Sequence, residues 1–120
     1  MTAVKPVRRT LDELLTINSE QAVQRLKMGD HVTVAREIEH FAYFHRSADA
    51  KAAAAELEGC DFRTSLTRKG FGTILLEARI QSDVERDSTD QFVRELYALV
   101  ERHGGFYDGY GGRIITKGRS

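Results

Sequence analysis

The chain is poor in the residues that mark specialised classes of protein. Its 120 residues include one cysteine, one proline and no tryptophan. The single cysteine, Cys60, excludes an internal disulfide framework and fits a reducing compartment. No apolar run approaches the roughly 20 residues that a membrane-spanning helix needs, and the N-terminal segment lacks the apolar core of a signal peptide. These features predict a cytoplasmic protein.

The chain also lacks an excess of charge of either sign. Lysines and arginines together number 18, and so do aspartates and glutamates. Non-specific binding to nucleic acid usually rests on a basic excess, so the overall composition disfavours it. Hydrophobic residues make up 41% and charged residues 30% of the chain, which is typical of a folded globular domain. A chain of this length is expected to form one domain with its own core.

Patterns typical of a metal site or of a nucleophile are missing as well. The four histidines are scattered, and no pair has the spacing of zinc ligands. We therefore predict no metal and no cofactor. His40, on an apolar strand face, is predicted to be a buried histidine with a hydrogen-bond partner. Cys60 has no neighbouring base to activate it and is predicted to be a small buried residue.

The N-terminal third of the chain predicts two helical segments. Thr10, with Glu13 three residues on, has the pattern of a capping box for a first helical turn. The stretch "NSEQAVQRLKMGD" predicts a second helix, capped by Asn18 or the residue after it. Its predicted packed face consists of Ala22, Val23 and Leu26.

The rest of the chain predicts a strand, a helix, a hairpin, a helix and a last strand. The segments are "REIEHFAYF", "SADAKAAAAELEGC", "DFRTSLTR" with "FGTILLEARI", "DSTDQFVRELYALVERH" and "GGFYDGYGG". This order predicts an α+β fold, a ferredoxin-like antiparallel sheet (βαββαβ) with helices on one face and an additional N-terminal helix. We expect a single domain over residues 10–116, with a flexible lead-in over 1–9 and a tail over 117–120.

Alternation along the first and last strands predicts a cluster of rings on the face without helices. Tyr107 and Gly109 are expected to point toward the helices. The alternate side chains of the first and last strands would share the opposite face, because the two strands are neighbours in this fold. A contiguous patch of rings beside carboxylates suggests an interface. The candidate partner-binding residues are Glu39, Phe41, Tyr43, Phe106, Asp108 and Tyr110. The alternative is that the N-terminal helix or a second subunit covers these rings.

Several of these segments resemble the regulator of ribonuclease E activity B family, also called the ribonuclease E inhibitor family. The similarity runs from about Asn18 to Gly111, and its most specific parts are "EHFAYF" and "HGGFYDGYG". The resemblance implies a ferredoxin-like variant with an added helix. It also implies a non-catalytic protein that binds the C-terminal region of ribonuclease E and so lowers RNA decay. No catalytic residues come with it.

The chain departs from the family pattern in two respects. Tyr110 stands where the family motif usually has tryptophan, and the best-known members are strongly acidic whereas this chain is neutral. Acidity would steer binding to an arginine-rich scaffold in the nuclease. We expect a monomer or homodimer with a protein partner.

Two other functions stay open at this point. Ferredoxin-like sheets can stack single-stranded RNA on exposed rings, but the neutral charge and the lack of a "GFGFV"-like strand argue against it. A remote alternative is a small hydrolase or nuclease that uses Glu39, His40 and Asp108.

Overall fold

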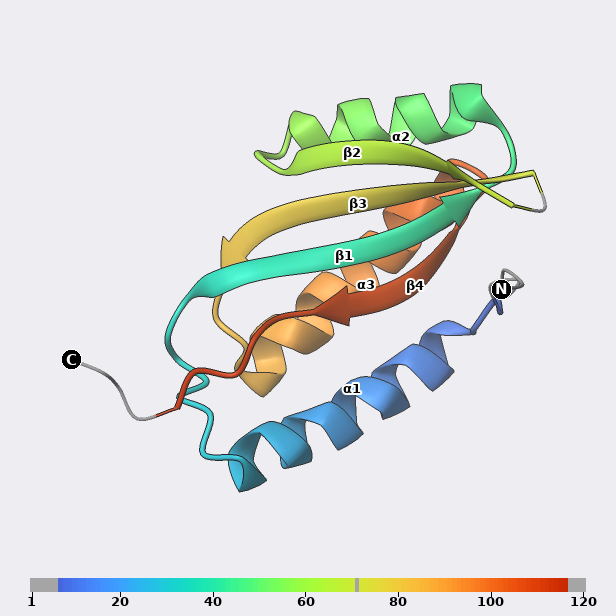
Figure 1. The fold of residues 1–120 in the computed structure, drawn as a ribbon. Coiled ribbons are helices and arrows are strands. Elements are labelled where there is room, and N and C mark those ends of the chain that lie inside the picture. Colours follow the sequence, from blue (N-terminus) through green and yellow to red (C-terminus); the bar gives the residue numbers. More distant parts are fainter. Residues whose placement is uncertain (1–6, 71, 117–120) are drawn as a thin grey trace.

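The computed structural model describes residues 7–70 and 72–116 as three helices and one four-stranded sheet (Figure 1). The observed order confirms the predicted helix followed by β-α-β-β-α-β. Residues 1–6 of the predicted lead-in and the predicted tail lie outside the described residues, so these boundaries stay predictions. The elements are α1 (Leu11–Lys27), β1 (Arg36–Phe44), α2 (Ser47–Glu58), β2 (Arg63–Lys69), β3 (Thr73–Ser82), α3 (Arg86–Arg102) and β4 (Phe106–Gly111).

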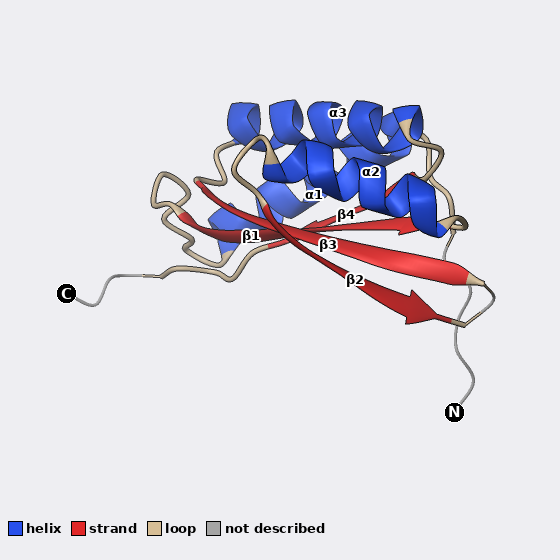
Figure 2. Ribbon diagram, turned by 90° about the horizontal axis from the view of Figure 1, so that it is seen from above, coloured by secondary structure: helices blue, strands red, loops and turns tan. Residues whose placement is uncertain are grey.

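The sheet is antiparallel throughout, with strand order β2-β3-β1-β4. The two central strands, β1 and β3, pair over their whole length from Arg36 opposite Ser82 to Phe44 opposite Ile74. Helices α2 and α3 cover one side of the sheet, and no helix of residues 7–70 or 72–116 lies on the other side (Figure 2). This arrangement confirms the predicted α+β fold class.

The core forms between the sheet and α2 and α3, as the strand pattern predicts. Alternate residues of β1 point into it, and Ile38 and Phe44 are completely buried. Helix α2 contributes small side chains such as Ala50 and Ala53, which allow close packing on the sheet. Tyr107 of β4 is 1% exposed and joins the same core, as predicted.

The N-terminal helix differs from the prediction. It is one continuous helix that starts seven residues before Asn18, and the capping box of Thr10 and Glu13 begins it. Asn18 is therefore no cap: it is 1% exposed inside the helix. The predicted packed face is also wrong, because Val23 and Leu26 are 51% and 66% exposed.

The position of α1 explains this difference. The helix runs alongside the β4 edge and packs against α3 (Figure 1). It turns Leu14 and Asn18 inward, and Asn18 donates hydrogen bonds to Thr89 and Asp90 of α3 at 2.8 and 2.7 Å. Because α1 docks at this edge, it leaves the helix-free face of the sheet uncovered.

A buried ion cluster joins three segments beside α1. Asp30 bonds Arg25 at 2.9 Å and Arg36 at 2.8 Å, and the side chains of Asp30 and Arg36 are fully buried. The carbonyls of Gly112 and Arg113 accept further bonds from the two guanidinium groups. Burial tends to raise the pKa of Asp30, but the hydrogen bonds from the two arginines outweigh it and hold that pKa below its usual value.

Candidate functional site

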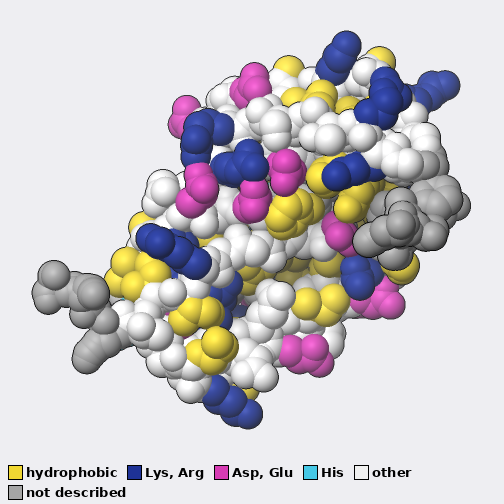
Figure 3. Space-filling view, viewed as in Figure 1, with side chains coloured by type: hydrophobic (Ala, Val, Ile, Leu, Met, Phe, Trp, Pro, Cys, Tyr) yellow, Lys and Arg dark blue, Asp and Glu magenta, His cyan; other side chains and the backbone are white. Residues whose placement is uncertain are grey.

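The helix-free face of the sheet is the surface where sequence reasoning places the partner site. Strand register fixes its members, because each cross-strand pair projects to one side. Figure 3 views the molecule from this side: side chains of both charges gather over β2 and β3, and hydrophobic side chains gather over β1. The side chains that β1 and β3 turn to this face are Glu37, Glu39, Phe41, Tyr43, Leu75, Glu77, Arg79 and Gln81.

Aromatic rings lie in the middle and at one end of this face. Phe41 lies opposite Gly109 on β4, which has no side chain to cover the ring. Tyr43 lies opposite Phe106, and their rings stack at a centroid distance of 5.6 Å. Phe106 is 7% exposed, whereas Phe41 and Tyr43 are half-buried. Phe41 and Tyr43 are therefore the accessible rings, and Phe106 supports Tyr43.

A β-bulge breaks the predicted alternation of β4. Phe41 pairs with Gly109 but Ala42 pairs with Tyr107, so Asp108 is an extra residue without a partner. The predicted common face of Phe106, Asp108 and Tyr110 is therefore wrong for Tyr110. The predicted helix-side position of Gly109 is also wrong, because Gly109 pairs with Phe41 on the helix-free face. A glycine within a strand often marks a bulge, so Gly109 was the feature of the sequence that could have indicated this one. In the structure Gly109 has a φ of +109°.

Tyr110 instead lies on the helix side, between α1 and α3. Its hydroxyl donates a hydrogen bond to Asn18, and its ring packs edge-on against Phe92 at 4.8 Å. Tyr110 lies opposite His40 in the strand register. Its role in this structure is to anchor α1, and it lies away from the candidate partner surface.

The carboxylates of the helix-free face are paired with arginines of the same face. Arg79 lies 2.6 Å from Glu39 and 3.8 Å from Glu77, and Arg63 pairs with Glu37. Register places Gly111 opposite Glu39, so the carboxylates of Glu39 and Asp108 do not form a pair. The face therefore carries both charges in alternation.

Asp108 and Tyr43 have pKa values shifted by their surroundings. Burial raises the pKa of Asp108, although Arg9, 3.0 Å away, opposes this. Burial also raises the pKa of Tyr43, and the negative charges of Asp108 and Glu77 add to it.

A hollow of about 710 Å³ opens at the end of this face where β1 begins and β4 ends. Glu37 and Glu39 line one wall, and Gly111 and Gly112 line another. The sequence analysis did not identify this feature. The adjacent glycines were the available signal, since they leave a strand end without side chains.

The residues predicted as a remote catalytic alternative, Glu39, His40 and Asp108, do not come together in one site. His40 points to the helix side, 2% exposed, whereas Glu39 points to the opposite face. The prediction of a buried histidine is confirmed, because His40 Nδ1 lies 2.7 Å from the Tyr107 hydroxyl. Cys60 is exposed, so its predicted burial is wrong: it follows α2 in a turn at the surface.

Among residues 7–70 and 72–116, no three histidine, cysteine, aspartate or glutamate side chains are grouped as metal ligands would be. None of the helices in the described part of the chain has both the length and the apolar composition needed to cross a bilayer.

Comparison with known proteins identifies one family. The family model described as "Regulator of ribonuclease activity B" matches residues 16–112. This match runs from within α1 to just past β4 and so includes the whole sheet. A comparison with curated proteins gives no match.

Proposed function

Because the chain belongs to the regulator of ribonuclease activity B family, we propose that it binds and inhibits an endoribonuclease of the ribonuclease E type. The family is regulatory and not catalytic, so the protein acts by occupying its partner. The partner region is the non-catalytic scaffold of the nuclease. The observation that carries this proposal is the helix-free face, which all three helices leave uncovered in the described structure (Figure 2).

The accessible rings supply the apolar part of the proposed binding surface. On the neighbouring strands, Phe41 lies between Gly109 of β4 and Glu77 of β3. Because Gly109 has no side chain, a flat group can lie against the Phe41 ring. Tyr43 extends this surface and rests on Phe106. Aromatic side chains that are held rigidly in place contribute strongly to protein interfaces.

The carboxylates supply the electrostatic part. Arg79 already binds between Glu39 and Glu77, which shows that this face accommodates a guanidinium group. A partner arginine can stack on Phe41 or Tyr43 and bond the outer oxygens of the same carboxylates. The surface therefore suits a partner segment rich in arginine. The proposed contact residues are Glu39, Phe41, Tyr43 and Asp108, with Phe106 as support.

Single-stranded RNA is the competing ligand for exposed rings on a sheet. On the helix-free face, Arg63 and Arg79 are paired with carboxylates of this chain. The carboxylates offset the charge of these arginines, so the two pairs add little net positive charge that could attract an RNA backbone. The pairing pattern favours a protein ligand.

The test measures binding of the purified protein to the scaffold region of the nuclease after ribonuclease treatment. We expect Phe41→Ala to weaken binding at least about tenfold, or 1.4 kcal/mol, with a melting temperature close to that of the unchanged protein. Leu26→Ala is the matched control, since it removes an exposed apolar side chain on α1, away from this face. It should leave the affinity unchanged.

A cleavage assay completes the test. The protein should slow RNA cleavage by the nuclease that contains its scaffold region, and Phe41→Ala should relieve this inhibition. Unchanged affinity of Phe41→Ala would show that the helix-free face is not the binding surface. Binding that disappears after ribonuclease treatment would favour the RNA alternative.

A further inference from the structure

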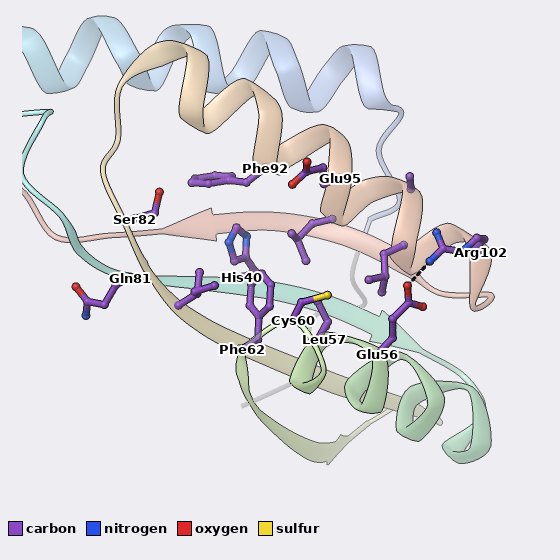
Figure 4. A pocket seen from close by; sticks show the side chains of 14 residues that line it. His40, Glu56, Leu57, Cys60, Phe62, Gln81, Ser82, Phe92, Glu95 and Arg102 are labelled. Carbon is purple, nitrogen blue, oxygen red and sulfur yellow. Dashed lines mark hydrogen bonds and ion pairs between the residues drawn. The ribbon is translucent and has the colours of Figure 1, made fainter.

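A second hollow, of about 660 Å³, lies between α2 and α3 on the side of the sheet opposite the candidate partner surface. Its walls are mainly apolar: Leu57 comes from α2, Phe62 from the turn before β2, and Phe92, Leu96 and Leu99 from α3 (Figure 4). Its volume is within the range of about 300–1,000 Å³ that small-molecule sites occupy. Phe62, Phe92 and Leu99 are only half-buried.

The buried alanines of α2, among them Ala50 and Ala53, do not line the hollow. Its wall on this side comes from Glu56, Leu57 and Cys60 at the end of α2 and in the turn that follows. At one end Glu56 of α2 bonds Arg102 at 2.6 Å (Figure 4). The same carboxylate lies 2.7 Å from Nε2 of His103. This contact ties the ends of the two helices together and limits the hollow on that side.

His40 lies at the inner end of the hollow, between Phe62 and Phe92 (Figure 4). Both rings pack edgewise against the imidazole, at centroid distances of 5.9 and 4.8 Å. The Nε2 atom is buried and has no hydrogen-bond partner among the described residues, so a ligand oxygen reaches it only when one of the rings packed against the imidazole shifts. A buried polar atom without a partner destabilises the folded protein, so a group that bonds to Nε2 is favoured there.

The hydrogen bond to Tyr107 determines what Nε2 offers. Burial lowers the pKa of His40 to about 3, so the imidazole is neutral at pH 7. If the Tyr107 hydroxyl donates to Nδ1, the ring proton is on Nε2, and only that N–H is without a partner. The other tautomer would leave both the Tyr107 O–H and the Nε2 lone pair unsatisfied. The network therefore makes Nε2 a donor.

We propose that this hollow binds a small uncharged organic molecule, whose apolar body lies between α2 and α3 and whose carbonyl, ether or hydroxyl oxygen accepts a hydrogen bond from His40 Nε2. A carboxylate at this depth would be desolvated beside a neutral ring. Glu56 and Glu95 at the rim would also repel an anion, and Arg102 is already paired with Glu56. A ligand ammonium group is unsuitable because its N–H donors would face the N–H donor of His40 Nε2.

A matched pair of probes tests this site. Acetophenone and ethylbenzene have the same carbon skeleton, but only acetophenone has an acceptor oxygen. We expect acetophenone to bind at least about tenfold more tightly and to shift the Nε2 proton and nitrogen resonances of His40. Cys60 lines the hollow and is the only cysteine, so bound probe should slow its alkylation by iodoacetamide.

The variant His40→Phe should abolish the difference between the two probes, because it removes the donor and keeps an apolar ring. The resonance measurement uses the unchanged protein and so does not depend on the folding of this variant. Equal affinities, binding that leaves the His40 resonances unmoved, or no binding of either probe would each overturn the proposal.

Discussion

At the scale of single residues, burial decides what each polar side chain contributes. His40 and Asp108 are both polar residues on strands, yet one is enclosed by rings and the other forms a part-buried ion pair with Arg9. A pair that solvent still reaches contributes about 0–1 kcal/mol to stability. The buried imidazole has a larger effect on stability because folding changes its affinity for a proton.

His40 should make the protein sensitive to mild acid. Its pKa falls from an ordinary 6.5 to about 3 on folding, so the unfolded chain binds a proton between these values and the folded protein does not. The contribution of neutral His40 to the free energy of unfolding is fully present above pH 6.5 and decreases as the pH is lowered. At pH 4 the loss from this group is roughly 3 kcal/mol. In urea titrations at pH 7, 5 and 4, His40→Gln should lose this part of the pH dependence.

The exposed His45 provides the control, since His45→Gln should keep the full pH dependence. The pH dependence is the readout, because His40→Gln also alters the contact with Tyr107 and so changes the absolute stability. An unchanged dependence in His40→Gln would contradict a neutral buried imidazole.

At the scale of elements, α1 is attached to the domain through polar contacts as well as apolar ones. Asn18 joins three elements: it bonds Thr89 and Asp90 on α3 and accepts a bond from Tyr110 on β4. The bulge in β4 makes the last of these possible, because it turns Tyr110 to the helix side. The conformation of the last strand thus determines where the first helix docks.

We expect Asn18→Ala to destabilise the protein by about 1–3 kcal/mol, because it leaves the Tyr110 hydroxyl buried without its acceptor. Alanine is the best helix former, so the helix itself is not weakened. Ser19→Ala, one residue along the same helix, is the control and should have little effect. The midpoint of urea unfolding measures both variants, and equal midpoints would show that the hydrogen bonds of Asn18 do not stabilise the docking of α1.

At the scale of the whole molecule, the Asp30 cluster closes the fold where distant parts of the chain meet. It joins the end of α1, the start of β1 and the segment after β4, whose Ile115 backbone also donates to Asp30 at 3.2 Å. Two arginines depend on this one carboxylate. Removing one partner of a buried ion pair is costly because the remaining charges lose their compensation.

Asp30→Asn should therefore destabilise the whole domain by about 3–5 kcal/mol at pH 7. The pKa of Asp30 is lowered on folding, so its contribution is present above the usual value of 3.8 and is lost as the pH falls through the folded pKa. The difference in the free energy of unfolding between Asp30→Asn and the unchanged protein should therefore become smaller below about pH 4. Asp87→Asn, an exposed aspartate in the first turn of α3, should show neither effect in the same denaturation series.

The sequence by itself determined the order and type of the elements and the inward face of β1. These follow from local periodicity: two residues along a strand and 3.6 along a helix place apolar side chains on one side. For the same reason the burial of His40 and Tyr107 could be predicted. The family resemblance rests on the same segments, and the family match over residues 16–112 confirms it.

Only the tertiary structure decided where α1 docks and which residues form the helix-free face. One extra residue at Asp108 reverses the side on which Tyr110 lies, and pairing with β1 decides whether that residue is accommodated as a bulge. Asn18 has the composition of a helix cap, but its partners lie about 70 to 90 positions away, so no local pattern reveals them. The hollow between α2 and α3 is likewise a property of spacing between elements, which side-chain size and long-range packing determine together.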